Sequence, residues 1–331
     1  MSASKSRSLN VSVERFDLAA PFVISRGARS VAEVVSVTIE EGLFRGRGEC
    51  VPYGRFGETL DGVVASIAGL RGAVEAGVER DALQSLLPAG AARNALDCAL
   101  WDLEAKRLGV RAHELAGLHR VAPVVTAFTL SLGSPQAMAE QAVVHADKPL
   151  LKLKLGGVGD EARLAAVRAA APRSDLIVDA NEAWRPDDLP RLFDACAEAG
   201  VLLIEQPLPQ GRDEALIQRP RSIPVCADES IHDREGLAAL RERYDLINIK
   251  LDKTGGLTEA FLLADEAQRL GFGLFLGCMV GTSLAMAPAL MLAPRCRFVD
   301  LDGPLLLARD RSPGLVYEDC VIQPPGPEVW G

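Results

Sequence analysis

The sequence predicts an α/β protein in which a TIM-type (β/α) barrel follows a smaller α+β capping domain. After about residue 120, eight short apolar runs recur, and each is followed by a segment with helical periodicity. From the second run onward, consecutive runs end 22 to 28 residues apart, which is the length that one strand, one helix and two short loops need. The first run lacks the G-x-G-x-x-G turn that would favour an open doubly wound sheet, so a closed parallel barrel is predicted.

Residues 1–119 are expected to form the capping domain. Up to about residue 60, apolar and polar residues alternate between Gly-rich turns, which favours β-strands. Two helical segments follow. The second, AARNALDCALWDLEAKRLG, places Leu96, Leu100 and Leu103 on one face and ends at Gly109.

Residues 120–302 are expected to form the barrel, and the Pro-rich tail 303–331 is expected to pack back on the capping domain. An uncharged stretch from Leu270 to Pro294 has roughly the length of a bilayer span, but its glycines and Pro288 favour a buried strand followed by a helix. The eight apolar runs of the barrel are PVVTAFTL, LLKLKLGG, DLIVDANE, VLLIEQP, IPVCADES, LINIKLD, FGLFLGCM and RFVDLD.

The composition favours a folded cytoplasmic protein. Among 331 residues, 48% are hydrophobic and 24% are charged, which excludes a disordered or fibrous chain. The net charge of −9 argues against nucleic acid as a partner, because phosphate binding needs clustered Lys and Arg. The seven cysteines are dispersed and the N-terminus has no apolar signal segment, which suits reduced thiols in the cytoplasm. No membrane partner is expected, and a homo-oligomeric state stays open.

Charged residues end six of the apolar runs. In a parallel barrel, the carboxyl ends of all strands open on one face, and catalytic groups gather there. Residues spread over about 150 positions are therefore expected to converge on one cavity. They are Lys152, Lys154, Asp179, Glu205, Asp228, Glu229, Lys250, Asp300 and Asp302.

The run LKLKL places two lysines inside the predicted barrel. Lys152 and Lys154 are two residues apart and point to one side of the strand, whereas the leucines face the surrounding helices. Burial lowers the pKa of an unpaired lysine, and a lowered pKa suits a base near neutral pH. In the alternative, each lysine only pairs with a neighbouring carboxylate. A third lysine, Lys250, and the carboxylates on the intervening strands favour the catalytic interpretation.

Three carboxylates end successive strands. Asp179, Glu205 and Asp228 would repel one another unless a cation lay among them. A set of oxygen ligands suits Mg²⁺, and without His or Cys ligands zinc is not expected. The sequence therefore predicts a magnesium site at this end of the barrel.

Lys154 and Lys250 are expected on opposite sides of an eight-stranded barrel, since Lys154 belongs to the second strand and Lys250 to the sixth. A substrate chelated to the metal would lie between them, with one lysine on each face of its reacting carbon. This arrangement suits removal of a proton α to a carboxylate and its return on the other face, with the metal stabilising the enediolate. The predicted product is an inverted stereocentre.

The motifs LKLK, VDANEAW, IEQPLP, CADES and NIKLDKTGG occur in this order, after APFVISRG and AARNALDCALWDLE in the first domain. With these motifs the chain resembles the enolase superfamily, and within it the muconate-lactonizing-like subgroup. The resemblance implies a modified, enolase-like barrel, Lys154 and Lys250 as acid/base catalysts, and the same three carboxylates as Mg²⁺ ligands. It also implies that Lys152 helps to hold the substrate carboxylate. Lys253 is expected to be solvated in the following loop, and Glu229 to pair with a nearby lysine.

An acidic pair on the last strand discriminates among the reactions of this subgroup. Asp300 and Asp302 are two residues apart in FVDLDGP, so both are expected to face the cavity. Such a pair suits a free α-ammonium, and it resembles the D-x-D of dipeptide epimerases, which holds the ammonium of the substrate. The alternatives are an N-acylamino acid racemase or a muconate cycloisomerase-like lyase on the same site, a barrel without catalysis, and two aspartates that are merely solvated.

Within the dipeptide epimerases, the pattern is most similar to those that act on L-Ala-D/L-Glu, which implies a role in murein peptide recycling. This resemblance also implies that Thr129, Cys278 and Val280 contact the dipeptide. An acidic second side chain needs a cation, for which Arg26 in SRGARS is the first choice and Arg55 in VPYGRFG the second. The uncharged residues after the seventh strand leave the preference for the second residue open.

Overall fold

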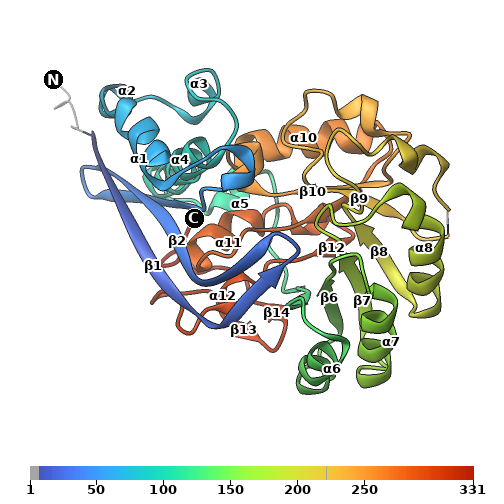
Figure 1. Cartoon of the computed structure of the whole chain (residues 1–331). Coiled ribbons are helices and arrows are strands. Elements are labelled where there is room, and N and C mark those ends of the chain that lie inside the picture. Colours follow the sequence, from blue (N-terminus) through green and yellow to red (C-terminus); the bar gives the residue numbers. More distant parts are fainter. Residues whose placement is uncertain (1–6, 221) are drawn as a thin grey trace, which may run out of the picture.

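The chain begins with a three-stranded antiparallel sheet, as the alternating pattern predicts. The computed structural model describes residues 7–220 and 222–331. In the sheet, β1 (Arg7–Ile24) pairs with β2 (Gly27–Glu41), which pairs on its other edge with β3 (Phe44–Cys50). The sheet is the blue layer on one side of the molecule in Figure 1.

A long helix, α4 (Ala91–Leu108), packs against β3 of this sheet. The two backbones approach so closely that a Cβ atom at Gly46 or Gly48 would lie 2.1 Å from a carbonyl oxygen of α4. Only glycine fits at these two positions for this reason. Shorter helices complete the region: η1 (Gly54–Phe56), α1 (Leu60–Gly69), α2 (Arg71–Glu75), α3 (Arg80–Leu83) and α5 (Ala112–Leu115).

Eight parallel strands follow in sequence order and form one curled sheet, which confirms the predicted (β/α) barrel architecture. The chain before the first of these strands meets the last strand, because Ala127 N donates a hydrogen bond to Val299 O at 2.8 Å. The strands are β5 (Phe128–Leu130), β6 (Leu150–Lys154), β7 (Asp175–Asp179), β8 (Val201–Glu205), β9 (Val225–Ala227), β10 (Leu246–Ile249), β11 (Gly273–Leu276) and β12 (Phe298–Val299).

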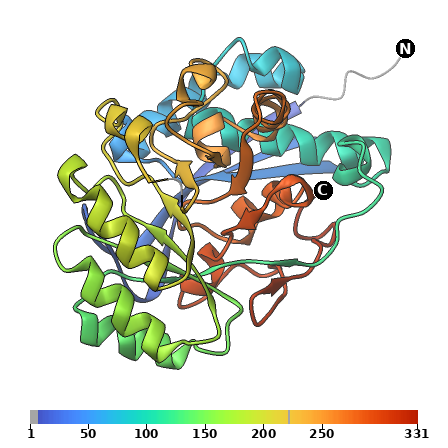
Figure 2. The ribbon, with the colours of Figure 1, turned by 90° about the vertical axis from the view of Figure 1, so that its right-hand side faces the viewer.

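Helices cover the outside of the strands, and α6, α7 and α8 lie beside β6, β7 and β8 (Figures 1 and 2). Two connections depart from the predicted strand–helix repeat. In the described residues, β8 to β9 and β9 to β10 are joined only through the 3-10 helices η3 (Glu214–Gln218) and η4 (Leu237–Leu240). Pro220, two residues after η3, limits its length at the C-terminal end, since proline cannot continue a helix. The remaining helices after β5 are α6 (Pro135–Val144), α7 (Asp160–Ala170), η2 (Pro186–Asp188), α8 (Leu189–Glu198), α9 (Leu251–Thr254), α10 (Leu257–Arg269), α11 (Ser283–Ala289), η5 (Ala293–Arg295) and α12 (Gly303–Leu306).

The barrel strands have two different sides. Leu151, Leu153 and Leu155 pack into the large apolar cluster that includes the outer helices, as the alternation in LKLKL predicts. The inward positions at the amino ends of the strands form a separate apolar floor. Two residues further along, the next inward position is charged on four consecutive strands, with Lys152, Asp179, Glu205 and Asp228, and is Thr129, Asn248 or Gly277 on three others. The floor consists of Ala127, Leu150, Ile177, Leu203, Cys226, Leu246 and Phe275.

The C-terminal tail contacts both regions of the molecule. β13 (Tyr317–Glu318) pairs with β14 (Val321–Ile322), which pairs with β4 (Val124–Val125) just before the barrel. Further along, Trp330 Nε1 donates a hydrogen bond to Cys98 O of α4 at 3.0 Å. The chain end therefore lies near α4 and α5, where Figure 1 marks it.

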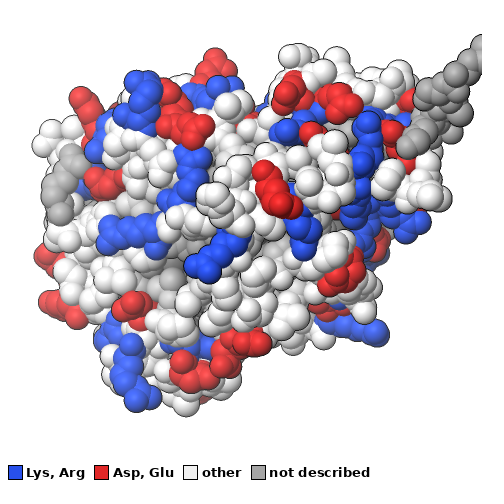
Figure 3. Space-filling model, turned by 180° about the vertical axis from the view of Figure 1, so that it is seen from behind, with Lys and Arg blue, Asp and Glu red and all other residues white. Residues whose placement is uncertain are grey.

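The uncharged stretch from residue 270 to 294 folds into the barrel as β11 and α11, as predicted. Among the described residues, no helix is both long enough and apolar enough to cross a bilayer. On the face in Figure 3, acidic and basic side chains are interspersed over a largely uncharged surface.

Candidate active site

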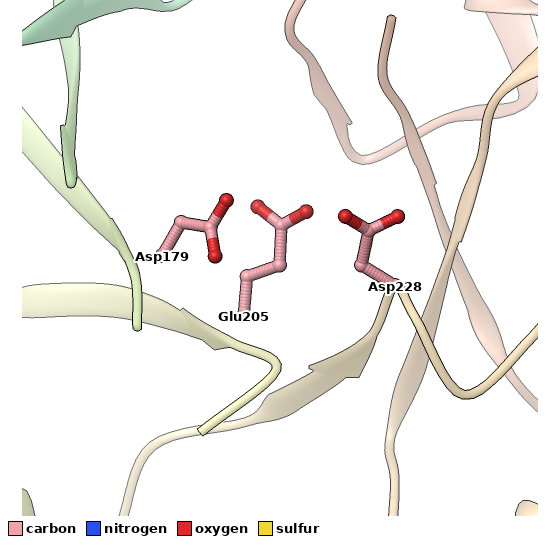
Figure 4. Close-up of side chains that lie close together, drawn as sticks. All are labelled: Asp179, Glu205 and Asp228. Carbon is pink, nitrogen blue, oxygen red and sulfur yellow. The ribbon is translucent and has the colours of Figure 1, made fainter. Parts of the chain in front are cut away.

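Three buried carboxylates meet at the carboxyl ends of consecutive strands. Asp179 is the last residue of β7, Glu205 is the last residue of β8, and Asp228 directly follows β9. One carboxylate oxygen of each residue lies within 4.8 Å of those of the other two. Figure 4 shows the three groups side by side around a common space. The fold thus brings together the residues for which a metal was predicted.

Hydrogen bonds from two asparagines orient these carboxylates. Asn181 donates to Asp179 from its backbone N at 2.9 Å and from Nδ2 at 3.1 Å, and Asn248 Nδ2 donates to Glu205 Oε1 at 2.6 Å. Burial and then the neighbouring charge of Asp179 raise the pKa of Glu205 to about 6, whereas the adjacent lysines outweigh burial and lower the pKa of Asp179 and Asp228, which keeps these two groups anionic. An oxygen-only donor set with this charge fits a hard divalent cation such as Mg²⁺.

Two lysines flank the carboxylates from opposite sides. Lys154 Nζ lies 2.6 Å from Asp179 Oδ2, and Lys250 Nζ lies 2.7 Å from Asp228 Oδ2. Lys154 ends β6 and Lys250 follows β10, and these strands are four positions apart in the eight-stranded order. The two ammonium groups therefore approach the space between them from opposite walls of the barrel.

A third lysine is enclosed by carboxylates. Lys152 Nζ lies 2.6 Å from Asp300 Oδ2 and 2.7 Å from Glu205 Oε2. Burial acts to lower the pKa of Lys152, but the charges of Asp300 and Glu205 outweigh it and raise that pKa. Burial is likewise outweighed at Lys250, whose pKa the charge of Asp228 raises. The lowered pKa expected from burial is therefore wrong for these two lysines, because each has a carboxylate partner.

The expectation that Lys253 is solvated is wrong. Its side chain is 1% exposed, and Nζ donates to Asp228 O, Asp228 Oδ1 and Asn248 O at 2.6 to 2.9 Å. Burial lowers the pKa of Lys253. The residue is buried because α9 starts directly after Lys250 and its single turn directs Lys253 back under Asp228. The spacing of three residues in NIKLDK is compatible with such a turn.

The expectation that Glu229 pairs with a lysine is also wrong. Its partner is Arg26 of the capping domain, whose Nη2 lies 2.6 Å from Glu229 Oε1. Burial and the charge of Asp228 raise the pKa of Glu229 to about 7. The two partners are 203 residues apart in the sequence, so the pairing depends on how the capping domain sits on the barrel.

The acidic pair lies immediately after β12 and not on the strand itself. Asp300 Oδ2 binds Lys152, whereas its Oδ1 is buried without a hydrogen-bond partner among the described residues. Asp302 Oδ2 accepts a hydrogen bond from Thr129 N at 2.7 Å. Burial and the charge of Asp300 raise the pKa of Asp302 to about 7. The two carboxyl groups are thus close to each other, buried, and not solvated.

A cavity of about 370 Å³ lies between the capping domain and the carboxyl ends of the strands. Thr129, Lys152, Asp300 and Asp302 are buried outside its lining. Of the residues predicted to act on or contact substrate, the lining includes Lys154, Lys250, Cys278, Val280 and Arg26, together with Arg55.

A charged residue of the cavity lining was not predicted from the sequence. Arg29 lines the same cavity, with its guanidinium 5.9 Å from the centre of the Tyr53 ring. Among the described residues, no carboxylate forms an ion pair with Arg29. The signal was present in SRGARS, which holds two arginines three residues apart, but the loop gave no reason to prefer the second.

The fold and the site together define a class of protein. A parallel barrel with clustered carboxylates between two opposed lysines, under a capping domain, is typical of enzymes that move a proton next to a carboxylate. The chain matches the family model "Mandelate racemase / muconate lactonizing enzyme, N-terminal domain" over residues 6–117 and "Enolase C-terminal domain-like" over residues 136–326. It therefore belongs to the mandelate racemase / muconate lactonizing enzyme family of the enolase superfamily.

Similar proteins are epimerases and racemases. An L-Ala-D/L-Glu epimerase of Escherichia coli K12 is 49% identical over 94% of this chain and 98% of its own length. An N-acetyl-D-glutamate racemase of a Pseudoalteromonas species is 46% identical over 90% of this chain and 95% of its own length. A crystal structure from Agrobacterium tumefaciens is 54% identical, has a TM-score of 0.97 and covers 98% of this chain and 100% of the other. It is described as an enolase family member with homology to dipeptide epimerases, with bound sodium and L-Ala-L-Glu.

Proposed function

We propose that this enzyme is a Mg²⁺-dependent dipeptide epimerase that inverts the α-carbon of the second residue, with L-Ala-D/L-Glu as its substrate. The observation that carries the proposal is the buried pair Asp300 and Asp302 next to the lysine–carboxylate site. A free α-ammonium is the substrate group that such a pair suits. The similarity to the Escherichia coli epimerase supports the same substrate. The reaction would serve the recycling of murein peptides in the cytoplasm.

The proton transfer is assigned to the two opposed lysines. One of Lys154 and Lys250 takes the α-proton from one face of the substrate, and the other returns a proton to the opposite face. Asp179, Glu205 and Asp228 would hold Mg²⁺, which supplies a Lewis acid for the substrate carboxylate. The base must be neutral when it acts.

Four further residues are assigned to substrate binding around these groups. Lys152 adds positive charge beside the substrate carboxylate. Cys278 and Val280 line the cavity after β11 and contact the dipeptide there. Thr129 acts through its backbone, because its N–H donates to Asp302 and holds that carboxylate in place.

Recognition of the acidic side chain of the substrate's second residue is assigned to the loop that carries Arg26 and Arg29. Arg26 lines the cavity, but its Nη atoms already donate to Asn181 O, Tyr53 Oη and the carboxylates of Glu182 and Glu229. Arg29 lines the cavity without an ion pair in the described part of the chain. We assign recognition of the side-chain carboxylate of the second residue to Arg29, with Arg26 as its neighbour in the cavity wall.

Racemisation of an N-acylated amino acid is the second candidate, because the Pseudoalteromonas relative is named for that reaction. An N-acyl group is neutral, so Asp300 would keep Lys152 as its partner but Asp302 would stay buried without a cationic partner, which is costly. The free ammonium of a dipeptide avoids this cost. The dipeptide reaction is therefore preferred.

A direct comparison of two substrates in D₂O tests the proposal. L-Ala-L-Glu and N-acetyl-L-glutamate are each incubated with the Mg²⁺-loaded enzyme, and deuterium at the α-carbon is followed by mass spectrometry. We expect kcat/KM for the dipeptide to be at least about 100-fold higher, because a buried charged pair rejects a ligand that cannot pair with it. A higher value for N-acetyl-L-glutamate would overturn the assignment.

A further inference from the structure

One carboxylate joins three segments that lie far apart in the sequence. Glu182 lies three residues after β7, and its side chain is only 8% exposed. Oε1 accepts hydrogen bonds from Arg55 Nη2 at 2.9 Å and from Gln210 N at 2.8 Å. Oε2 accepts from Arg55 Nε at 2.9 Å and from Arg26 Nη1 at 3.2 Å. The Arg55 guanidinium thus binds both carboxylate oxygens in a bidentate ion pair, which is the strongest geometry for an arginine and a carboxylate.

The backbone at this point has a conformation that residues other than glycine rarely adopt. Asn181 has a φ of 45° and Glu182 a φ of 67°, and such left-handed residues each cost about 1 to 3 kcal/mol. Asn181 O accepts hydrogen bonds from Ser25 Oγ at 2.9 Å and Arg26 Nη1 at 2.8 Å. Contacts from the capping domain therefore help to hold the strained residues that follow the carboxylate ending β7.

The capping residues involved also belong to the wall of the catalytic cavity. Arg26, Tyr53 and Arg55 line it, and Arg26 Nη2 donates to Tyr53 Oη at 2.7 Å. In the described chain, the ion pair with Glu182 is the only one that Arg55 forms. Arg26 has a second partner in Glu229. Loss of the Glu182 charge would therefore leave Arg55 without an ionic partner.

Glu182 itself is not part of the cavity lining, although its neighbour Asn181 is. Burial acts to raise the pKa of Glu182, but the hydrogen bonds from Arg55 and Gln210 outweigh it and hold that pKa below its usual value. The carboxylate is therefore ionised at neutral pH and faces protein, not substrate.

We propose that Glu182 is a positioning residue that fastens segments 25–29 and 53–57 of the capping domain over the catalytic cavity. The inference rests on the proposed function, since it concerns how that site is covered. Without this carboxylate, the two segments leave the barrel more often. Substrate binding then weakens, while the groups that transfer the proton stay in place.

Hydrogen exchange of the Mg²⁺-loaded enzyme without substrate tests the fastening directly. Glu182→Gln keeps the shape and removes the charge, and Arg55→Gln breaks the same contact from the capping side. Glu198→Gln, on the exposed surface of α8, is the matched control. We expect backbone amides to exchange about tenfold faster in both segments for Glu182→Gln and in 53–57 for Arg55→Gln, with the rest of the chain unchanged. Unchanged exchange in both segments of Glu182→Gln would overturn the inference.

Kinetics separate positioning from catalysis. KM for L-Ala-L-Glu should rise about tenfold in Glu182→Gln, with kcat within about threefold of the original enzyme. The double variant Glu182→Gln/Arg55→Gln should add little to Glu182→Gln, because the contact that Arg55→Gln removes is already lost there. A fall in kcat at constant KM would contradict the assignment. If the original enzyme does not act on dipeptides, the proposed function fails, whereas the exchange result still decides the fastening.

Discussion

Lys250 Nζ lies 2.7 Å from Asp228 Oδ2, so a candidate base and a candidate metal ligand share one hydrogen bond. On the opposite wall, Lys154 is paired in the same way with Asp179 at 2.6 Å. Each lysine is thus placed by a carboxylate that would also bind the metal. Removing a carboxylate should therefore weaken metal binding and at the same time release the lysine beside it.

The metal site can be tested without an activity assay. Asp179→Asn should weaken Mg²⁺ binding at least about 100-fold, since it removes one anionic ligand from a set of three. Isothermal titration calorimetry gives the dissociation constant. Asp175→Asn, at the exposed start of the same strand, is the control and should bind Mg²⁺ normally. Equal affinity in the two variants would exclude Asp179 as a ligand.

The acidic pair predicts how the enzyme discriminates between substrates. Asp302→Asn should lower kcat/KM for L-Ala-L-Glu about 100-fold, because the substrate ammonium loses a charged partner. N-acetyl-L-glutamate has no ammonium and should be affected much less. Steady-state rates for both substrates check this, with the exposed Asp319→Asn as control. The same fold loss on both substrates would mean that Asp302 does not recognise the ammonium.

The position of Arg29 in the cavity predicts a preference for an acidic second residue in the substrate. Arg29→Gln should raise KM for L-Ala-L-Glu by about 10- to 100-fold, because the buried end of an acidic side chain loses its cation. L-Ala-L-Leu, which has no such group, should change by less than about threefold. Arg173→Gln, exposed at the far end of the barrel, should leave both values unchanged. A parallel loss on both dipeptides would argue against Arg29 as the specificity residue.

A buried carboxyl away from the site predicts a pH-dependent change in stability. Asp97 in α4 accepts hydrogen bonds from Thr258 N and Gln84 Nε2, and burial raises its pKa to about 6. The folded state therefore binds a proton more tightly than the unfolded state. Stability falls as pH rises from about 4 to about 6, by about 3 kcal/mol at about 1.4 kcal/mol per pKa unit.

Asp97→Asn removes this titration and should raise the melting temperature more at pH 8 than at pH 5. The asparagine amide can pair with Gln84 Oε1, which has no hydrogen-bond partner among the described residues. Differential scanning calorimetry at both pH values gives the comparison, with the exposed Asp81→Asn as control. If Asp97→Asn changed the melting temperature by the same amount at both pH values, ionisation of Asp97 would not be the cause.

The sequence predicted those features that depend on local pattern. The alternation in LKLKL placed Lys152 and Lys154 inside the barrel, and the strand ends placed Asp179 and Glu205 at one rim. These predictions require only that successive side chains alternate and that parallel strands open on one face. The apolar floor below them follows from the same alternation.

Features that depend on contacts between distant segments were not predicted. Lys253 was expected in solvent because the sequence does not reveal that α9 starts directly after Lys250. Glu229 was expected to bind a lysine, but its partner is Arg26, which only the docking of the capping domain brings near. The contact of Arg55 with Glu182 has the same origin.

The central claim is that two lysines act on opposite faces of one carbon. Lys154→Ala and Lys250→Ala are each incubated in D₂O with L-Ala-L-Glu and with L-Ala-D-Glu, and α-deuterium is measured by mass spectrometry. Folding and Mg²⁺ binding are verified for both variants. Each variant should lose exchange from one diastereomer and keep it with the other, and the two variants should have opposite preferences. Equal loss of exchange from both diastereomers in each variant would contradict the two-lysine account.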